Sequence, residues 1–163
     1  MFYVNDAITG VADNELIKIK FEVDINPPRY ASFEHKYRLL PAPYEVNLYD
    51  AASLFAGKVH AVICRAWKNR VKGRDLYDYV FYLSRRIPLN LKHLRERLLQ
   101  SEYITKDVEC SLEEVQKMLC ERFDEIDFRQ ARSDVEPFIH DVNSLSVWNA
   151  DFFKQITDSL TAK

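Results

Sequence analysis

The sequence has little of several features that mark common protein classes. Only 3 of its 163 residues are glycine, which argues against a glycine-rich phosphate loop and against a turn-rich β-sandwich. Its 3 cysteines, Cys64, Cys110 and Cys120, are odd in number and have no C-x-x-C spacing, as expected of a reduced cytosolic protein. The formal net charge of −2 provides no global basic field to attract nucleic acid, so any phosphate site must be local.

Long apolar runs are also missing. No run approaches the roughly 20 residues that span a bilayer, and the N-terminus shows no signal-peptide pattern. We therefore expect a cytoplasmic protein with no membrane partner. Hydrophobic residues still make up 47% of the chain and aromatic residues 13%, which is enough to build a core in about one domain's length.

The first part of the chain predicts antiparallel strands. Residues 16–25 favour a strand because apolar and charged side chains alternate from Ile17 onward. Residues 33–40 and 44–49 alternate as well, and the prolines between them indicate a hairpin. The charged face of the first strand includes Glu22; such a face is usually solvated, but its carboxylates could also hold Mg²⁺.

From Asp50 onward the hydrophobic pattern has a helical period. Asp50 is a good N-cap for a first helix, and a second helix should start after Gly73. Further helices are predicted at Leu91–Leu99, after the capping box Ser111–Glu114, at Phe128–Val135 and at Trp148–Leu160. We predict one α+β unit over residues 1–163, with a strand-rich part at 1–49 and a helical bundle at 50–163.

A single lysine interrupts the apolar stripe of the first helix. Lys58 lies three residues after Phe55 and four before Val62, within the apolar face. A buried ammonium needs an anion. A lysine at the edge of a stripe can instead extend its charged end into water, and periodicity alone favours that interpretation.

The second helix opens with two carboxylates on one face. Asp75 in the first turn can simply favour the positive end of the helix dipole, and Asp78 can pair with Arg74 or Arg85. Together they could instead position a base or a metal ion, and the spacing does not decide between these interpretations.

A strongly basic run, Arg65–Arg74, connects the two helices and contains Trp67. A solvated turn is the usual role of such a run. The functional alternative is contact with phosphates or RNA, with Trp67 available for stacking on a base.

Three segments together resemble a known family: Lys18–Asp24, then Ser53–Ala61 with Arg65, then Gly73–Asp78 with its R-D-x-Y-D pattern. They look like the AbiEii/AbiGii toxins, which are nucleotidyltransferase-fold toxins of bacterial toxin–antitoxin and phage abortive-infection systems. The resemblance extends over about Leu16 to Arg86, and Asp134–Ile139 looks like the family's closing segment.

The resemblance implies a nucleotide site around the first helix. Lys58 would contact the triphosphate of a bound NTP, and Arg65 and Arg74 would support the phosphates or the acids. The implied reaction is in-line attack on the α-phosphate, with Mg²⁺ stabilising developing charge and pyrophosphate leaving. The implied acceptor is an RNA end, such as a tRNA 3′ end, or a protein hydroxyl, and a cognate antitoxin is an implied partner.

The resemblance also gives roles to the acids. Asp75 and Asp78 would belong to the active site as catalytic base or orienting acid, and Glu22 would lie near the metal ion.

One departure separates the chain from this family. The family opens with a Gly-Ser pair and an Asp-x-Asp metal pair, whereas the residues before Lys18 contain Asp6 and Asp13 but no Asp-x-Asp. The chain therefore resembles the C-terminal part of the fold, as a truncated gene product, a fragment or half of a split enzyme. We expect it to be inactive alone. The alternatives are a non-catalytic module that binds a nucleotide, RNA or an antitoxin, and an α+β domain whose Lys58 simply extends into water.

Overall fold

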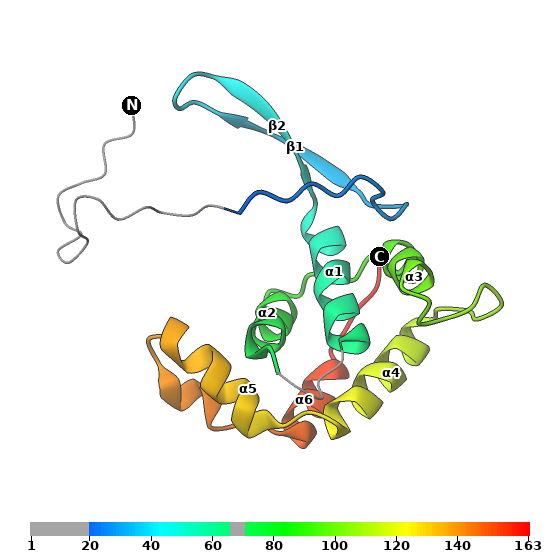
Figure 1. Ribbon diagram of the computed structural model, residues 1–163, viewed down its shortest axis with the longest axis vertical. Helices are drawn as coiled ribbons and strands as arrows, with labels where there is room; N and C mark the ends of the chain where they lie inside the picture. Colours follow the sequence, from blue (N-terminus) through cyan, green and yellow to red (C-terminus); the bar gives the residue numbers. More distant parts are fainter. Residues whose placement is uncertain (1–19, 66–70) are drawn as a thin grey trace.

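The computed structural model describes residues 20–65 and 71–163 and has an α+β architecture (Figure 1). Two antiparallel strands, β1 (Phe33–Arg38) and β2 (Tyr44–Tyr49), form a hairpin that extends away from the helices. The second strand has the predicted bounds, while the first ends two residues earlier than predicted, at Arg38. The predicted fold class is therefore confirmed.

The predicted strand at residues 16–25 is wrong over its described part. Residues 20–24 have no regular secondary structure, Ile25 lies in a bend, and residues 16–19 fall outside the described residues. The apolar side chains of Phe21, Val23 and Ile25 are exposed. Alternation gives a segment a face to bury, but a strand also needs a hydrogen-bonding neighbour, and the sheet of the described residues contains only β1 and β2.

The hairpin does not present one apolar face. In the observed register Phe33 faces Tyr49 and their rings stack at 4.9 Å, which puts Phe33 and Tyr37 on one side of the sheet. The apolar residues of β2, Val46 and Leu48, point to the other side, opposite charged residues of β1. Each face is therefore mixed, and the hydrophobic core lies among the helices.

The helical part follows the predicted order. Its α-helices are α1 (Ala51–Cys64), α2 (Gly73–Ser84), α3 (Leu91–Gln100), α4 (Leu112–Asp124), α5 (Phe128–Val135) and α6 (Ala150–Thr157), with 3₁₀ turns η1 (Glu136–Phe138) and η2 (Val142–Leu145). The predicted caps are present: Asp50 accepts a hydrogen bond from the Ser53 amide at 2.8 Å, and Ser111 and Glu114 form a reciprocal capping box.

The core contains a row of buried aromatic rings that packs α1 against α2. The ring of Phe55 in α1 lies 5.8 Å from that of Tyr79 in α2, and Tyr79 lies 5.9 Å from Phe123 in α4. Phe123 in turn contacts Phe153 of α6 at 5.2 Å. The Tyr79 hydroxyl is 2.8 Å from the Thr157 hydroxyl, so this buried polar group has a partner.

The start of α2 is held tightly against α5. A Cβ atom at Gly73 would lie 1.9 Å from the carbonyl oxygen of Ala131 and 2.7 Å from a methyl group of Val135. Just before the helix, the amide of the buried Val71 donates to the side chain of Gln130 at 2.8 Å. Only glycine permits this approach, which places the first turn of α2 between α1 and α5.

Candidate functional site

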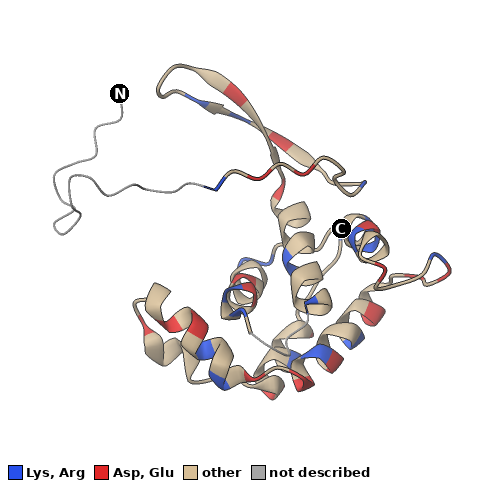
Figure 2. Ribbon diagram, in the orientation of Figure 1, with Lys and Arg blue, Asp and Glu red and all other residues tan. Residues whose placement is uncertain are grey.

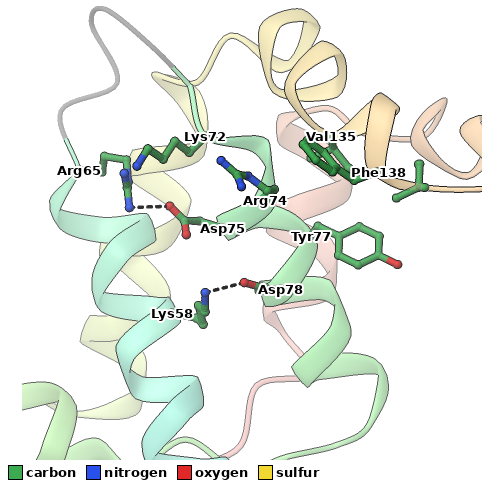
Figure 3. Close-up of a pocket in the computed structure, with 10 residues that line it drawn as sticks. Lys58, Arg65, Lys72, Arg74, Asp75, Tyr77, Asp78, Val135 and Phe138 are labelled. Atoms are coloured by element: carbon green, nitrogen blue, oxygen red, sulfur yellow. Dashed lines mark ion pairs between the residues drawn. The ribbon is translucent and has the colours of Figure 1, made fainter. Parts of the chain in front are cut away.

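Two ion pairs connect α1 to α2 (Figure 3). The ammonium of Lys58 lies 2.6 Å from Asp78, and the guanidinium of Arg65 lies 2.9 Å from Asp75. Lys58 lies on α1 and Arg65 is the C-cap residue of that helix, while the two aspartates are about one turn apart on α2. Each pair therefore forms one rung of a ladder between the helices, and we call these four residues the ion-pair ladder.

The ladder shows how Lys58 is accommodated in an apolar stripe. Its side chain is 39% exposed, so it lies at the edge of the packed face, and its charged end contacts the carboxylate of Asp78. The ammonium thus meets an anion supplied by the chain itself. Asp78 pairs with Lys58 and not with Arg85, whose guanidinium lies over the ring of Phe81.

The second rung is more deeply buried. The side chain of Asp75 is 11% exposed, against 35% for that of Asp78. A buried carboxylate is tolerated when a cation accompanies it, and Arg65 fills that role. Asp75 also lies in the first turn of α2, where the helix dipole favours negative charge.

An aromatic layer lies beneath the exposed rung. Tyr82, one turn after Asp78, stacks on the buried ring of Phe55 at 5.0 Å. Burial raises the pKa of Tyr82, the carboxylate of Asp78 raises it further, and the ammonium of Lys58 partly offsets both effects. The Lys58–Asp78 pair therefore borders the core on one side and solvent on the other.

The guanidinium of Arg74 lies near the end of α5 and the turn that follows it. Its Nε atom is 3.9 Å from a carboxylate oxygen of Asp134, and its guanidinium carbon is 5.3 Å from the ring centre of Phe138. The family-like segment Asp134–Ile139 thus lies beside the start of α2. The sequence resemblance singled out this segment but not its position next to Arg74.

These residues surround an open pocket of about 540 Å³. It contains all five residues predicted for the nucleotide and catalytic site on α1 and α2: Lys58, Arg65, Arg74, Asp75 and Asp78. Five lining residues were not predicted for the site: Lys72, Tyr77, Val135, Phe138 and Ile139. All five belong to segments that the sequence had marked, namely the basic run, the R-D-x-Y-D pattern and the closing segment.

Glu22, the predicted metal ligand, is not part of this pocket. Its carboxylate is exposed and pairs with Lys20, in the extended segment before β1. Within residues 20–65 and 71–163, no three His, Cys, Asp or Glu side chains gather into a group that could hold a metal ion. The role of Glu22 as a metal ligand stays a prediction.

The positive charge of the pocket is local. Elsewhere in the described chain, basic and acidic residues are intermixed on the helices (Figure 2), in line with the small net charge. Trp67, the predicted stacking residue of the basic run, lies outside the described residues.

Arginine and lysine side chains that converge on one pocket suit the binding of anionic groups such as phosphates. A family model, the nucleotidyl transferase AbiEii toxin of type IV toxin–antitoxin systems, matches residues 3–155. Since the match covers most of the chain, the protein belongs to this family. No match was found among curated proteins or among solved structures.

Family membership makes the protein a toxin of a type IV toxin–antitoxin system with a nucleotidyltransferase-like nature, and it implies an antitoxin partner. In the part of the chain that the structure describes, every helix is too short or too polar to cross a membrane.

Proposed function

We propose that the pocket binds the triphosphate of an NTP and that the protein acts as a nucleotidyltransferase toxin. The observation that carries the proposal is the meeting of four cations and two carboxylates around one pocket of about 540 Å³. Lys58 and Arg65 reach the pocket from α1, while Lys72 and Arg74 reach it from the start of α2. Guanidinium and ammonium groups in this arrangement suit phosphate oxygens.

The proposed reaction transfers a nucleotide to a hydroxyl group. The acceptor oxygen attacks the α-phosphorus of the NTP, the bond to the β-phosphate oxygen breaks, and pyrophosphate leaves. Asp78, the more exposed acid, would take the proton of the acceptor, and Asp75, held by Arg65, would orient the reacting groups. Lys58 and Arg65 would balance the charge on the phosphates.

The acceptor in this proposal is an RNA end, such as a tRNA 3′ end, or a protein hydroxyl, and the location is cytoplasmic. Mg²⁺ remains a prediction from the family, because among the described residues no three His, Cys, Asp or Glu side chains form a group that could hold a metal ion. The roles given above to Lys58, Arg65, Asp75 and Asp78 do not require one of them to be a metal ligand.

The test compares two lysines that are both ion-paired. Lys58→Ala should weaken NTP binding about tenfold or more, since it removes a charge-assisted contact, and the NTP should no longer raise the melting temperature. Lys154→Ala is the matched control, because Lys154 is 34% exposed and pairs with Asp124 outside the pocket. Undiminished protection of the Lys58→Ala protein by NTP would show that the phosphates bind elsewhere.

A second function is favoured by one observation: a cation already pairs with each of the two ladder acids. In this alternative the chain only binds a nucleotide, RNA or the antitoxin. It predicts binding that is independent of Mg²⁺ and no incorporation of nucleotide. Transfer of label from an α-labelled NTP to RNA or protein by the wild-type chain, lost in Asp75→Asn, would exclude it.

A further inference from the structure

Two exposed aromatic side chains lie at the same pocket, away from its ladder side. Phe138 is 68% exposed and Tyr77 is 44% exposed, and both line the pocket. Single exposed aromatic residues are common on protein surfaces. Two at the rim of a cationic pocket are different, because planar rings and cations together match the two parts of a nucleotide.

The residues of α2 that line the pocket point to two sides, one charged and one aromatic. At about 100° per residue, Asp75, Asp78, Arg74 and Tyr77 follow one another around one continuous side of the helix. The acids face α1, and the ring of Tyr77 faces the opposite way. Figure 3 shows Lys58 and Arg65 on one side of the pocket, and Tyr77 with Phe138 on the other. A nucleotide has the same polarity, with an anionic triphosphate at one end and a planar base at the other.

Arg74 lies between the charged side and the aromatic side of the pocket. Its guanidinium carbon is 5.3 Å from the ring centre of Phe138, while its Nε atom approaches Asp134 at 3.9 Å. A guanidinium stacks on aromatic rings and also binds phosphate, so Arg74 can contact a base stacked on Phe138 or the phosphates beside it.

The aromatic side is held in a fixed position relative to the acids. Phe138 ends the short turn η1, which directly follows α5. Val135, at the end of α5, is buried against the start of α2, where Gly73 allows the close approach of the two helices. The position of η1 relative to the ladder therefore depends on how α5 packs on α2.

We propose that Tyr77 and Phe138 form the base-binding wall of the nucleotide site, where the base of the NTP stacks while its triphosphate contacts Lys58 and Arg65. This inference rests on the proposed nucleotide function and adds the part of the site that recognises the base. It distinguishes an NTP from a bare polyphosphate, which has no base to stack.

The test uses two probes, ATP and inorganic tripolyphosphate, and measures the dissociation constants of both by calorimetry on the full chain. Phe138→Ala should weaken ATP binding about tenfold through the lost stacking, and it should leave tripolyphosphate binding within about twofold. Tyr77→Ala should change the two affinities in the same selective way. Because both side chains are exposed, we expect both variants to fold, as circular dichroism would show.

Phe81→Ala is the matched control. Phe81 also lies on α2, is 39% exposed and has an arginine, Arg85, over its ring at 4.2 Å, but it does not line the pocket. Its loss should change neither affinity.

The outcomes separate this inference from the proposed function. If the wild-type chain binds neither probe, the nucleotide function fails, and the base wall with it. If both probes bind and Phe138→Ala leaves ATP affinity unchanged, or weakens both probes equally, only the base wall is refuted. If Phe138→Ala weakens binding of a single-stranded RNA oligonucleotide while ATP affinity is kept, the rings serve the acceptor, and the assignment to the NTP is wrong.

Discussion

Gly73 lets the start of α2 lie against the backbone of α5, and this contact positions the pocket residues of both helices. Replacing it with alanine would put a methyl group 1.9 Å from the Ala131 carbonyl oxygen, so α2 and α5 must move apart. We expect Gly73→Ala to lower the free energy of unfolding by about 1–3 kcal/mol, as overpacking does, and to weaken tripolyphosphate binding. Urea denaturation and calorimetry would measure the two effects.

Gly57 provides the control for that change. It lies inside α1, and a Cβ atom there would meet only the guanidinium group of Arg97, at ordinary contact distances of 3.5 Å and more. Gly57→Ala should therefore be neutral or stabilising by up to about 1 kcal/mol, because alanine favours a helix interior more than glycine. Equal destabilisation by both changes would contradict the role given to the α2–α5 contact.

The buried His93 gives the protein a pH-dependent stability. Its Nδ1 atom lies 2.8 Å from the Arg29 carbonyl oxygen and donates to it, and its Nε2 atom accepts from Arg97 at 3.0 Å, so the ring is neutral. Burial lowers the pKa of His93, the Arg29 carbonyl partly opposes this, and the charge of Arg97 lowers it further.

The sign of the effect follows from proton linkage. Below pH 6.5, the ordinary histidine pKa, the unfolded chain binds a proton that native His93 resists, so the free energy of unfolding falls as the pH drops toward the native pKa. His93→Gln should flatten this slope in denaturation curves measured between pH 5 and 7.5. Burial also lowers the pKa of His60, so part of the slope should persist. An unchanged slope would contradict the assignment to His93.

The sequence identified the unusual residues but not how they pair. The apolar stripe around Lys58 and the acid pair on the second helix could both be read from spacing. Their direct contact depends on α1 and α2 lying side by side through Phe55 and Tyr79, and this packing is not encoded in either segment alone. Glu22 lies on a segment with a clear alternating pattern, yet it is not a pocket residue. A regular pattern therefore does not by itself identify a site residue.

At the level of elements, local signals predicted the structure where local interactions suffice. Helix caps depend on residues three positions apart, so Asp50 and the Ser111–Glu114 box were predictable. A strand depends on a partner that can lie anywhere in the chain. The alternating residues 20–25 have no such partner among the described strands, so a prediction from alternation alone was wrong there.

The two rungs of the ladder should differ in strength. Asp75→Asn removes the charge that accompanies the half-buried Arg65 and should lower the free energy of unfolding by about 1–3 kcal/mol. Asp78→Asn affects an exposed pair and should cost less than about 1 kcal/mol. Chemical denaturation of both variants would measure the difference. A larger loss for Asp78→Asn would contradict the proposal that the more buried rung is the stronger one.

At the level of the whole molecule, the predicted order of hairpin and helices from Phe33 onward agrees with the structure, but the hairpin's exposure and the position of the closing segment were not predicted. The two apolar rows of the hairpin lie on opposite faces, which depends on a register that alternation within each strand cannot specify. The segment Asp134–Ile139 reaches Arg74 only because α5 packs on α2. Long-range packing therefore completes a site whose separate parts the sequence had marked.

Because of the ladder, an anion that binds in the pocket competes with the aspartates already paired there. Any anion that binds Lys58 or Arg65 has to displace or share the aspartate already in contact with it. Its affinity then reflects the difference between an incoming and an outgoing ion pair, not the full strength of the new one. When an anion displaces an aspartate from its cation, that carboxylate is left unpaired. Anion binding and release of the acid are therefore coupled.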